Sequence, residues 1–206
     1  MMQHLSSFLA RAFSPVLTPT YGIFLSLWVS VLSYQALSTR ITVLFVIFGI
    51  TVLLPAAIIR FMLRLNIFSS HQLDDRRERT YPYLCIITCY FLAVVYIVYV
   101  HAPLWLTAFT LGGTIACATS LLINFAWKIS AHTTGMGGIV ALLFFLHRTG
   151  LDAFNSLWLF CLVIILAGVI GTIRIYQGKH TLMQVLAGFA NGCACVHYTI
   201  SFFYQY

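Results

Sequence analysis

Long runs of apolar residues dominate this chain, and short polar segments separate them. Seven runs extend over roughly residues 19–36, 41–62, 83–100, 104–127, 133–146, 154–173 and 182–203. Apolar residues fill these runs continuously and do not alternate with polar ones, which favours helices over membrane-spanning strands. A helix needs about 20 residues to cross a bilayer. The fifth run is therefore short, and we expect it to be tilted, partly embedded, or to start deeper in the membrane.

The composition indicates the class of protein. Of the 206 residues, 61% are hydrophobic and only 7% are charged, and the mean hydropathy is +0.96. Because soluble domains carry about a quarter charged residues, we expect an integral membrane protein. We predict one all-α transmembrane domain over residues 1–206, a bundle of six to seven helices, in which residues 1–16 form an interfacial helix.

The charges and the cysteines limit which partners and metal ions we expect the protein to bind. The net charge of +7 comes from few residues at the ends of the runs, which argues against nucleic-acid binding and favours anionic headgroups or a phosphorylated substrate. All six cysteines lie within apolar runs, where they pack as small core residues. The pair Cys193 and Cys195 lacks the spacing of a zinc site, so we expect no metal and no cofactor.

Three polar segments stand out between the runs. We call them the Arg79 loop (residues 63–82), the His132 segment (residues 128–135) and the His180 segment (residues 174–184). Ionisable groups at or inside a membrane are costly, so such segments are candidates for function. The loop follows two runs, the His132 segment four and the His180 segment six. An even number of crossings predicts that all three lie on the same membrane face.

Together the three segments contain the groups that bind phosphate. The cations are Arg76, Arg77, Arg79, Lys128, Arg174 and Lys179. Ser130 offers a hydroxyl, and helices that begin near Thr133 and Thr181 offer free N–H groups. One histidine could attack phosphorus while the other protonates the leaving oxygen. Lys128 is equally well explained as an anchor that reaches the headgroups.

The two histidine segments resemble motifs of the type 2 phosphatidic acid phosphatase superfamily. The family's second motif is Pro-Ser-Gly-His, and here Ser130 and His132 match while the proline and the glycine do not. Its third motif is Ser-Arg, five residues, His, three residues, Asp. Here Arg174 and His180 keep that spacing, and Gln184 occupies the position of the aspartate.

The Arg79 loop lies where the family's first motif, Lys, six residues, Arg-Pro, is expected. Arg79 stands for the arginine, but the proline is displaced to Pro82 and Gln72 stands in the position of the lysine. The resemblance covers residues 63–188. It implies a transmembrane bundle of the type 2 phosphatidic acid phosphatase type, in a divergent branch of that superfamily.

The resemblance implies a role for three residues in catalysis. His180 would be the nucleophile and form a phosphohistidine, and His132 would be the general acid for the lipid leaving group. Gln184 would orient the His180 ring in place of the family's aspartate. A glutamine oxygen can accept the imidazole N–H, but it cannot stabilise the imidazolium with a full charge.

Five further residues would hold the phosphate oxygens. Arg174, Arg79 and Ser130 take this role from the family, Arg76 replaces the missing lysine, and Lys128 joins them by its position. The implied substrate is a phosphate or pyrophosphate monoester of a membrane lipid, in a multi-pass protein of a bacterial plasma membrane. The positive-inside rule favours a cytoplasmic site, but a phosphate site gathers cations for its own reasons, so both facings stay open, as does the oligomeric state.

Two other functions compete with the lipid phosphatase. A non-catalytic phospholipid-binding protein of the same fold is favoured by Gln184 and by the altered first motif. An intramembrane prenyltransferase is suggested by Asp74 and Asp75, but such enzymes need a second acidic motif for Mg²⁺, and neither histidine segment contains an acidic residue.

Overall fold

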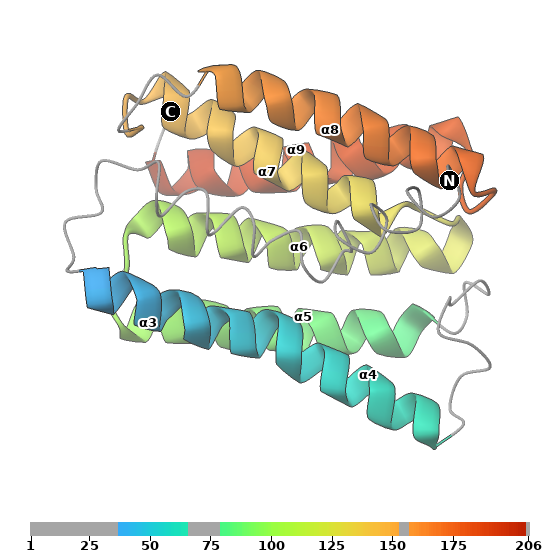
Figure 1. Ribbon diagram of the computed structural model, residues 1–206, viewed down its shortest axis with the longest axis horizontal. Coiled ribbons are helices and arrows are strands. Elements are labelled where there is room, and N and C mark those ends of the chain that lie inside the picture. The colour runs from blue at the N-terminus through green and yellow to red at the C-terminus, as the bar shows by residue number, and fades with distance from the viewer. Residues whose placement is uncertain (1–36, 66–78, 153–156, 205–206) are drawn as a thin grey trace.

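The computed structural model describes residues 37–65, 79–152 and 157–204, and this part of the chain is helical without a strand (Figure 1). The elements are α3 (Leu37–Phe48), η1 (Gly49–Leu53), α4 (Leu54–Arg64), α5 (Thr80–Tyr99), α6 (Leu104–Ala126), α7 (Ala131–Arg148), α8 (Leu157–Tyr176) and α9 (Leu182–Tyr204). The predicted interfacial helix at 1–16 and the first apolar run lie outside the described residues.

Five helical stretches in the described part are long and apolar enough to cross a membrane. They are Ile41–Arg64, Thr80–Tyr99, Leu104–Ala126, Leu157–Tyr176 and Leu182–Tyr204. The first of them joins α3, η1 and α4 into one continuous stretch. These stretches confirm the expectation of a multi-pass α-helical membrane protein.

Helix α7 corresponds to the short fifth run and is not among these five stretches. It has 18 residues and extends beyond the predicted run at both ends, so it is about 27 Å long. Most of its central side chains are buried, and it packs against α6, α8 and α9. The helix is therefore sheltered by protein, which explains why it tolerates the polar residues of its first turns.

Successive helices run in opposite directions through the bundle. The end of α4, the start of α5, the junction of α6 and α7, and the turn from α8 to α9 all lie at one end, on the right in Figure 1. This end carries Arg79, the His132 segment and the His180 turn. The structure thus places these polar parts on one face, as the even span counts predict.

A π-helical turn, η1, accommodates a proline within the first described stretch. Pro55 follows it at the start of α4, where its missing N–H and its ring would disturb a regular α-helix. The Leu54 N–H bonds to the Gly49 carbonyl five residues back, and the Thr51 hydroxyl donates to the Ile47 carbonyl at 2.7 Å. The stretch therefore continues to Arg64 without a break.

Helices α7 and α9 run parallel and approach each other through glycines. A Cβ added to Gly192 would lie 1.9 Å from the Thr134 carbonyl oxygen, and one added to Gly137 would lie 2.2 Å from the Phe189 carbonyl oxygen. Only hydrogen fits at these positions. Small residues allow such close approach in membranes, where van der Waals packing holds helices together.

Polar side chains join α6 to α9 below the polar face. The Asn191 amide donates to the Ala116 carbonyl and to the Ser120 hydroxyl, both at 3.0 Å, and its oxygen accepts from the Thr119 hydroxyl at 2.8 Å. Interhelical hydrogen bonds of this kind contribute to helix association in lipid.

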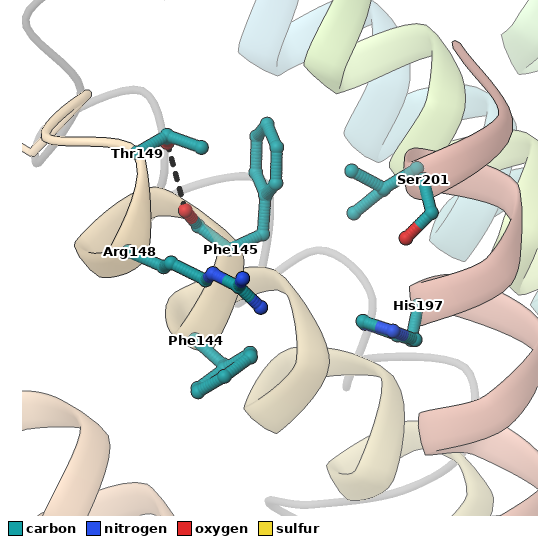
Figure 2. Close-up of a pocket in the computed structure, with 7 residues that line it drawn as sticks. Phe144, Phe145, Arg148, Thr149, His197 and Ser201 are labelled. Atoms are coloured by element: carbon teal, nitrogen blue, oxygen red, sulfur yellow. Dashed lines mark hydrogen bonds between the residues drawn. The ribbon is translucent and has the colours of Figure 1, made fainter. Parts of the chain in front are cut away.

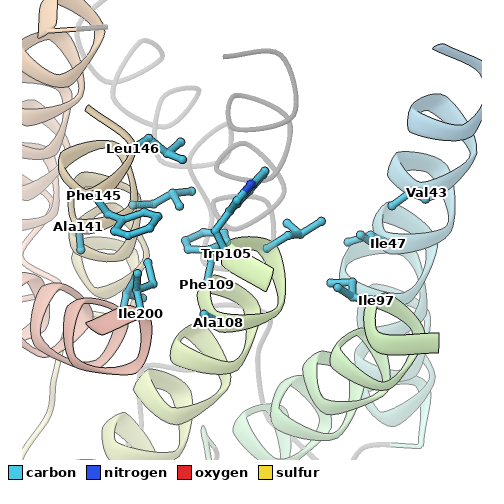
Figure 3. Packing of buried hydrophobic residues seen from close by; sticks show 13 residues of the cluster. Val43, Ile47, Ile97, Trp105, Ala108, Phe109, Ala141, Phe145, Leu146 and Ile200 are labelled. Carbon is cyan, nitrogen blue, oxygen red and sulfur yellow. The ribbon is translucent and has the colours of Figure 1, made fainter. Parts of the chain in front are cut away.

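Two apolar clusters complete the packing. The larger joins α3, α5, α6, α7 and α9, with Ile47, Ile97, Trp105 and Leu142 among its fully buried members (Figure 3). The second packs α7 against α8 through residues such as Leu143 and Val163. Together they fix α7, and therefore the His132 segment at its start, in the middle of the bundle.

The contact between α7 and α9 can be tested with a pair of glycine substitutions. Gly192→Ala forces a methyl group against backbone, so we expect it to destabilise the protein by roughly 1–3 kcal/mol. Gly113→Ala on α6 is the control, because a Cβ there has no neighbour within 4 Å. Thermal unfolding in detergent measures both. Equal midpoints for the two variants would contradict the close approach.

Candidate active site

The turn from α8 to α9 positions His180. Gly178 has a φ of +65°, the Gly178 N–H bonds to the Ile175 carbonyl, and the Lys179 N–H bonds to the Arg174 carbonyl. These two bonds form a Schellman motif, which ends α8 and turns the chain sharply. His180 follows at once and is only 7% exposed, although it lies outside both helices.

A capping box at the start of α9 fixes Gln184. The Thr181 hydroxyl accepts a bond from the Gln184 N–H at 3.4 Å, and the Gln184 side-chain oxygen accepts one from the Thr181 N–H at 3.1 Å. This reciprocal pair satisfies two backbone donors of the first turn. It also fixes the orientation of the amide, because the Thr181 N–H requires an oxygen acceptor.

The same Gln184 oxygen orients His180. It lies 3.3 Å from His180 Nδ1. Since this oxygen only accepts, the proton of the neutral ring lies on Nδ1, and Nε2 keeps its lone pair. The contact with Gln184 therefore favours the tautomer in which Nε2 is unprotonated.

The His132 segment is tied to the His180 segment by backbone contacts. The Ser130 N–H donates to the Gln184 carbonyl at 3.2 Å, and the Thr133 hydroxyl donates to the Val185 carbonyl at 2.9 Å. Gly188 makes this possible, because a Cβ there would lie 2.5 Å from the Ser130 carbonyl oxygen. The starts of α7 and α9 thus form one rigid unit.

Three cations from three different segments act on His180. Burial lowers its pKa most, and the charges of Arg174, Arg79 and Lys128 lower it further, from 6.5 to about 3. The hydrogen bond to Gln184 opposes this shift. Arg174 is itself held in place, because its Nη1 donates to the Gln177 side-chain oxygen at 2.9 Å. His180 is therefore a neutral imidazole in a positive field, and that field suits an anion.

The structure brings together most of the residues that the sequence singles out. His180 is hydrogen-bonded to Gln184, and Arg174, Arg79 and Lys128 are near enough for their charges to lower its pKa. Ser130 is fully buried, and its hydroxyl caps α7 by accepting from the Thr133 N–H at 3.5 Å. His132, half-buried, lies in the first turn of α7 beside Ser130. Arg76 lies outside the described residues, as do Asp74, Asp75 and Glu78.

Sequence reasoning missed several contacts that support this site. Thr181 and Gln184 show the Thr-x-x-Gln signature of a capping box, which identifies Gln184 as a cap as well as a histidine partner. Gly188 and Gly192 have the spacing of small residues at a helix–helix contact. No pattern in the sequence singled out Gln177, because its role depends on how the turn brings its side chain to Arg174.

Comparison of the chain with models of known protein families, with curated proteins and with solved structures finds no match. The likeness to type 2 phosphatidic acid phosphatases therefore rests on the motif residues. The function is argued below from those residues and from the geometry of the site.

Proposed function

We propose that this protein is a membrane lipid phosphatase that hydrolyses a phosphate or pyrophosphate monoester of a lipid through a phosphohistidine. One observation carries the proposal: a buried, neutral His180 has its Nδ1 held by Gln184 and lies within the influence of three cations. A neutral imidazole is nucleophilic at Nε2, and surrounding cations attract a phosphate and stabilise its developing charge.

The reaction proceeds in two displacements. His180 Nε2 attacks phosphorus, the bond from phosphorus to the lipid oxygen breaks, and His132 gives its proton to that oxygen. Water then attacks the phosphohistidine, His132 accepts the proton of the water, and inorganic phosphate and neutral His180 are released. Gln184 accepts the Nδ1–H throughout.

Arginine and lysine supply the binding energy for the phosphate. Arg174 and Arg79 offer guanidinium forks that match phosphate oxygens, and Lys128 adds a point charge. Arg76 would take the place of the family's lysine. Ser130 contributes through its place at the start of α7, where free backbone N–H groups favour an anion.

One observation favours a second candidate, a non-catalytic phospholipid-binding protein. Gln184 carries no charge, and its oxygen already serves the capping box. A phosphohistidine intermediate puts positive charge on the imidazole, and a neutral amide stabilises that charge less than a carboxylate does. The same cations would then bind the phosphate of a lipid, and the protein would not hydrolyse its ester bond.

The nucleophile can be tested with His180→Ala. We expect at least a thousandfold loss of inorganic phosphate release from phosphatidic acid or an isoprenyl pyrophosphate in mixed micelles, because the attacking atom is removed. His147→Ala, at the other end of α7, is the control and should keep the activity. Release that persists in EDTA separates this enzyme from a Mg²⁺-dependent prenyltransferase. Binding of these lipids by the unaltered protein without any phosphate release would support the scaffold.

The role of position 184 can be tested with Gln184→Asp. A carboxylate restores a full charge opposite Nδ1, and we expect phosphate release to rise by about tenfold. Gln184→Ala removes both the cap and the ring partner and should lower it. Rates that are equal in all three proteins would show that position 184 does not act on the nucleophile.

The charge state of His180 gives a pH prediction. Because its pKa lies near 3, the ring should stay neutral down to about pH 4.5 and become protonated only as the pH falls further. Arg174→Gln removes the largest cationic contribution and should raise this pKa. Nitrogen NMR of labelled histidine measures both effects. An imidazolium at position 180 at pH 5 in the unaltered protein would contradict the neutral nucleophile.

A further inference from the structure

A second polar recess lies at the opposite end of the bundle, where α7 and α9 finish. It is a cavity of about 220 Å³ with apolar walls from Phe144, Phe145 and Ile200, and its polar lining includes Arg148, His197 and Ser201 (Figure 2). Helix α7 separates it from the His180 site, because Ser130 and Arg148 are 18 residues apart, or about 27 Å along a helix. The recess is therefore distinct from the proposed active site.

The recess lies between the ends of α7 and α9, at one end of the helical stretches that are long enough to cross a membrane. The Phe145 and Tyr204 rings pack with centroids 4.8 Å apart, so α7 and α9 end at a similar depth. His197 precedes the last residue of α9 by seven positions, which places it about 10 Å inside the end of that helix. In a membrane-spanning α9 that ends among the headgroups, this is the depth at which headgroups meet acyl chains.

Arg148 is directed into this recess. Side chains on a helix lean towards its N-terminus, so the last residue of α7 leans back towards the membrane interior. Figure 2 shows the Arg148 side chain extending towards the His197 ring on α9. The nearby Asp152 pairs with His147, at 3.3 Å. Within the described residues, no hydrogen bond or ion pair holds the Arg148 guanidinium.

Arg148 and His197 are both exposed on the chain itself, so an anionic group of the surrounding lipid can reach them. Charged side chains inside the membrane are costly unless they are neutralised. The Arg148 guanidinium, the His197 ring and the Ser201 hydroxyl all offer donors, and the several acceptor oxygens of a phosphate match them. Sites for drug-sized ligands occupy about 300–1,000 Å³, so this smaller cavity suits a headgroup better than a whole molecule.

We propose that this recess binds the phosphodiester of an anionic phospholipid in the leaflet opposite the His180 site. The Arg148 guanidinium and the His197 ring contact the phosphate, and Ser201 donates from the next turn of α9. The aromatic side chains of α7 contact the glycerol and the first acyl carbons. If Arg148 were only an anchor at the headgroups, its guanidinium would point outwards to water, and the protein would show no preference for one lipid over another.

Native mass spectrometry of the purified full chain in detergent tests this proposal. We titrate the protein with phosphatidylglycerol, with phosphatidylcholine and with inorganic phosphate. Arg148→Gln should weaken one phosphatidylglycerol site by at least about tenfold, because it removes a charge-assisted pair. Arg64→Gln, which removes an exposed cation at the other end of the bundle, should leave that site intact.

Three results would overturn the proposal. Equal phosphatidylglycerol affinity in the unaltered protein and in Arg148→Gln would show that the guanidinium does not contribute to the site. Equal affinity of the unaltered protein for phosphatidylcholine and phosphatidylglycerol would show that the site does not require a lipid with a net negative charge. Saturation by inorganic phosphate with complete loss of bound lipid would make free phosphate the ligand. If Arg148→Gln does not fold, His197→Phe provides the same test, since the His197 side chain is exposed and a phenyl ring can keep its contact with the Tyr198 ring.

Discussion

The close approach of α7 and α9 is the constraint on which the rest of the structure depends. Backbone carbonyls of one helix occupy the space where side chains of the other would be, at Gly188, Gly192 and Gly137. This approach lets the Ser130 N–H reach the Gln184 carbonyl and the Thr133 hydroxyl reach the Val185 carbonyl. In lipid there is no water to satisfy such groups, so their pairing and the packing of the two helices reinforce each other.

The electrostatics of the His180 site depend on the paired starts of α7 and α9. His180 is buried at the start of α9, and the charges of Arg79 just before α5, of Lys128 at the α6–α7 junction and of Arg174 on α8 lower its pKa. Burial and positive charge both disfavour the imidazolium, and only the Gln184 oxygen favours it. The protein thus keeps a neutral histidine among positive charges, an arrangement that an anionic ligand would stabilise and a solvated loop would not need.

The two ends of α7 show different uses of polar residues in one membrane protein. At its start, Ser130 and Thr133 bond to backbone and build the site. At its end, Arg148 is directed towards an open recess and His147 pairs with Asp152. The middle of the helix is buried against α6, α8 and α9, and its polar residues lie at its two ends.

The sequence by itself determined the all-helical membrane class, the approximate bounds of the described helices and the common face of the polar segments, because hydrophobic length and span parity depend on local composition alone. Through the motif resemblance and their positions it also singled out His180, Gln184, Arg174, Arg79 and Lys128, whose roles stay predictions. The tertiary structure decided that Gln184 serves both the capping box and the His180 ring, that Gln177 holds Arg174, and that Ser130 is buried as a helix cap. It also decided that Arg148 and His197 share a recess. The first three features are contacts between residues three or four positions apart, and their geometry depends on how the turn and the helix start fold. The recess depends on side chains of α7 and α9 meeting in space, and periodicity along the chain carries no information about such a meeting.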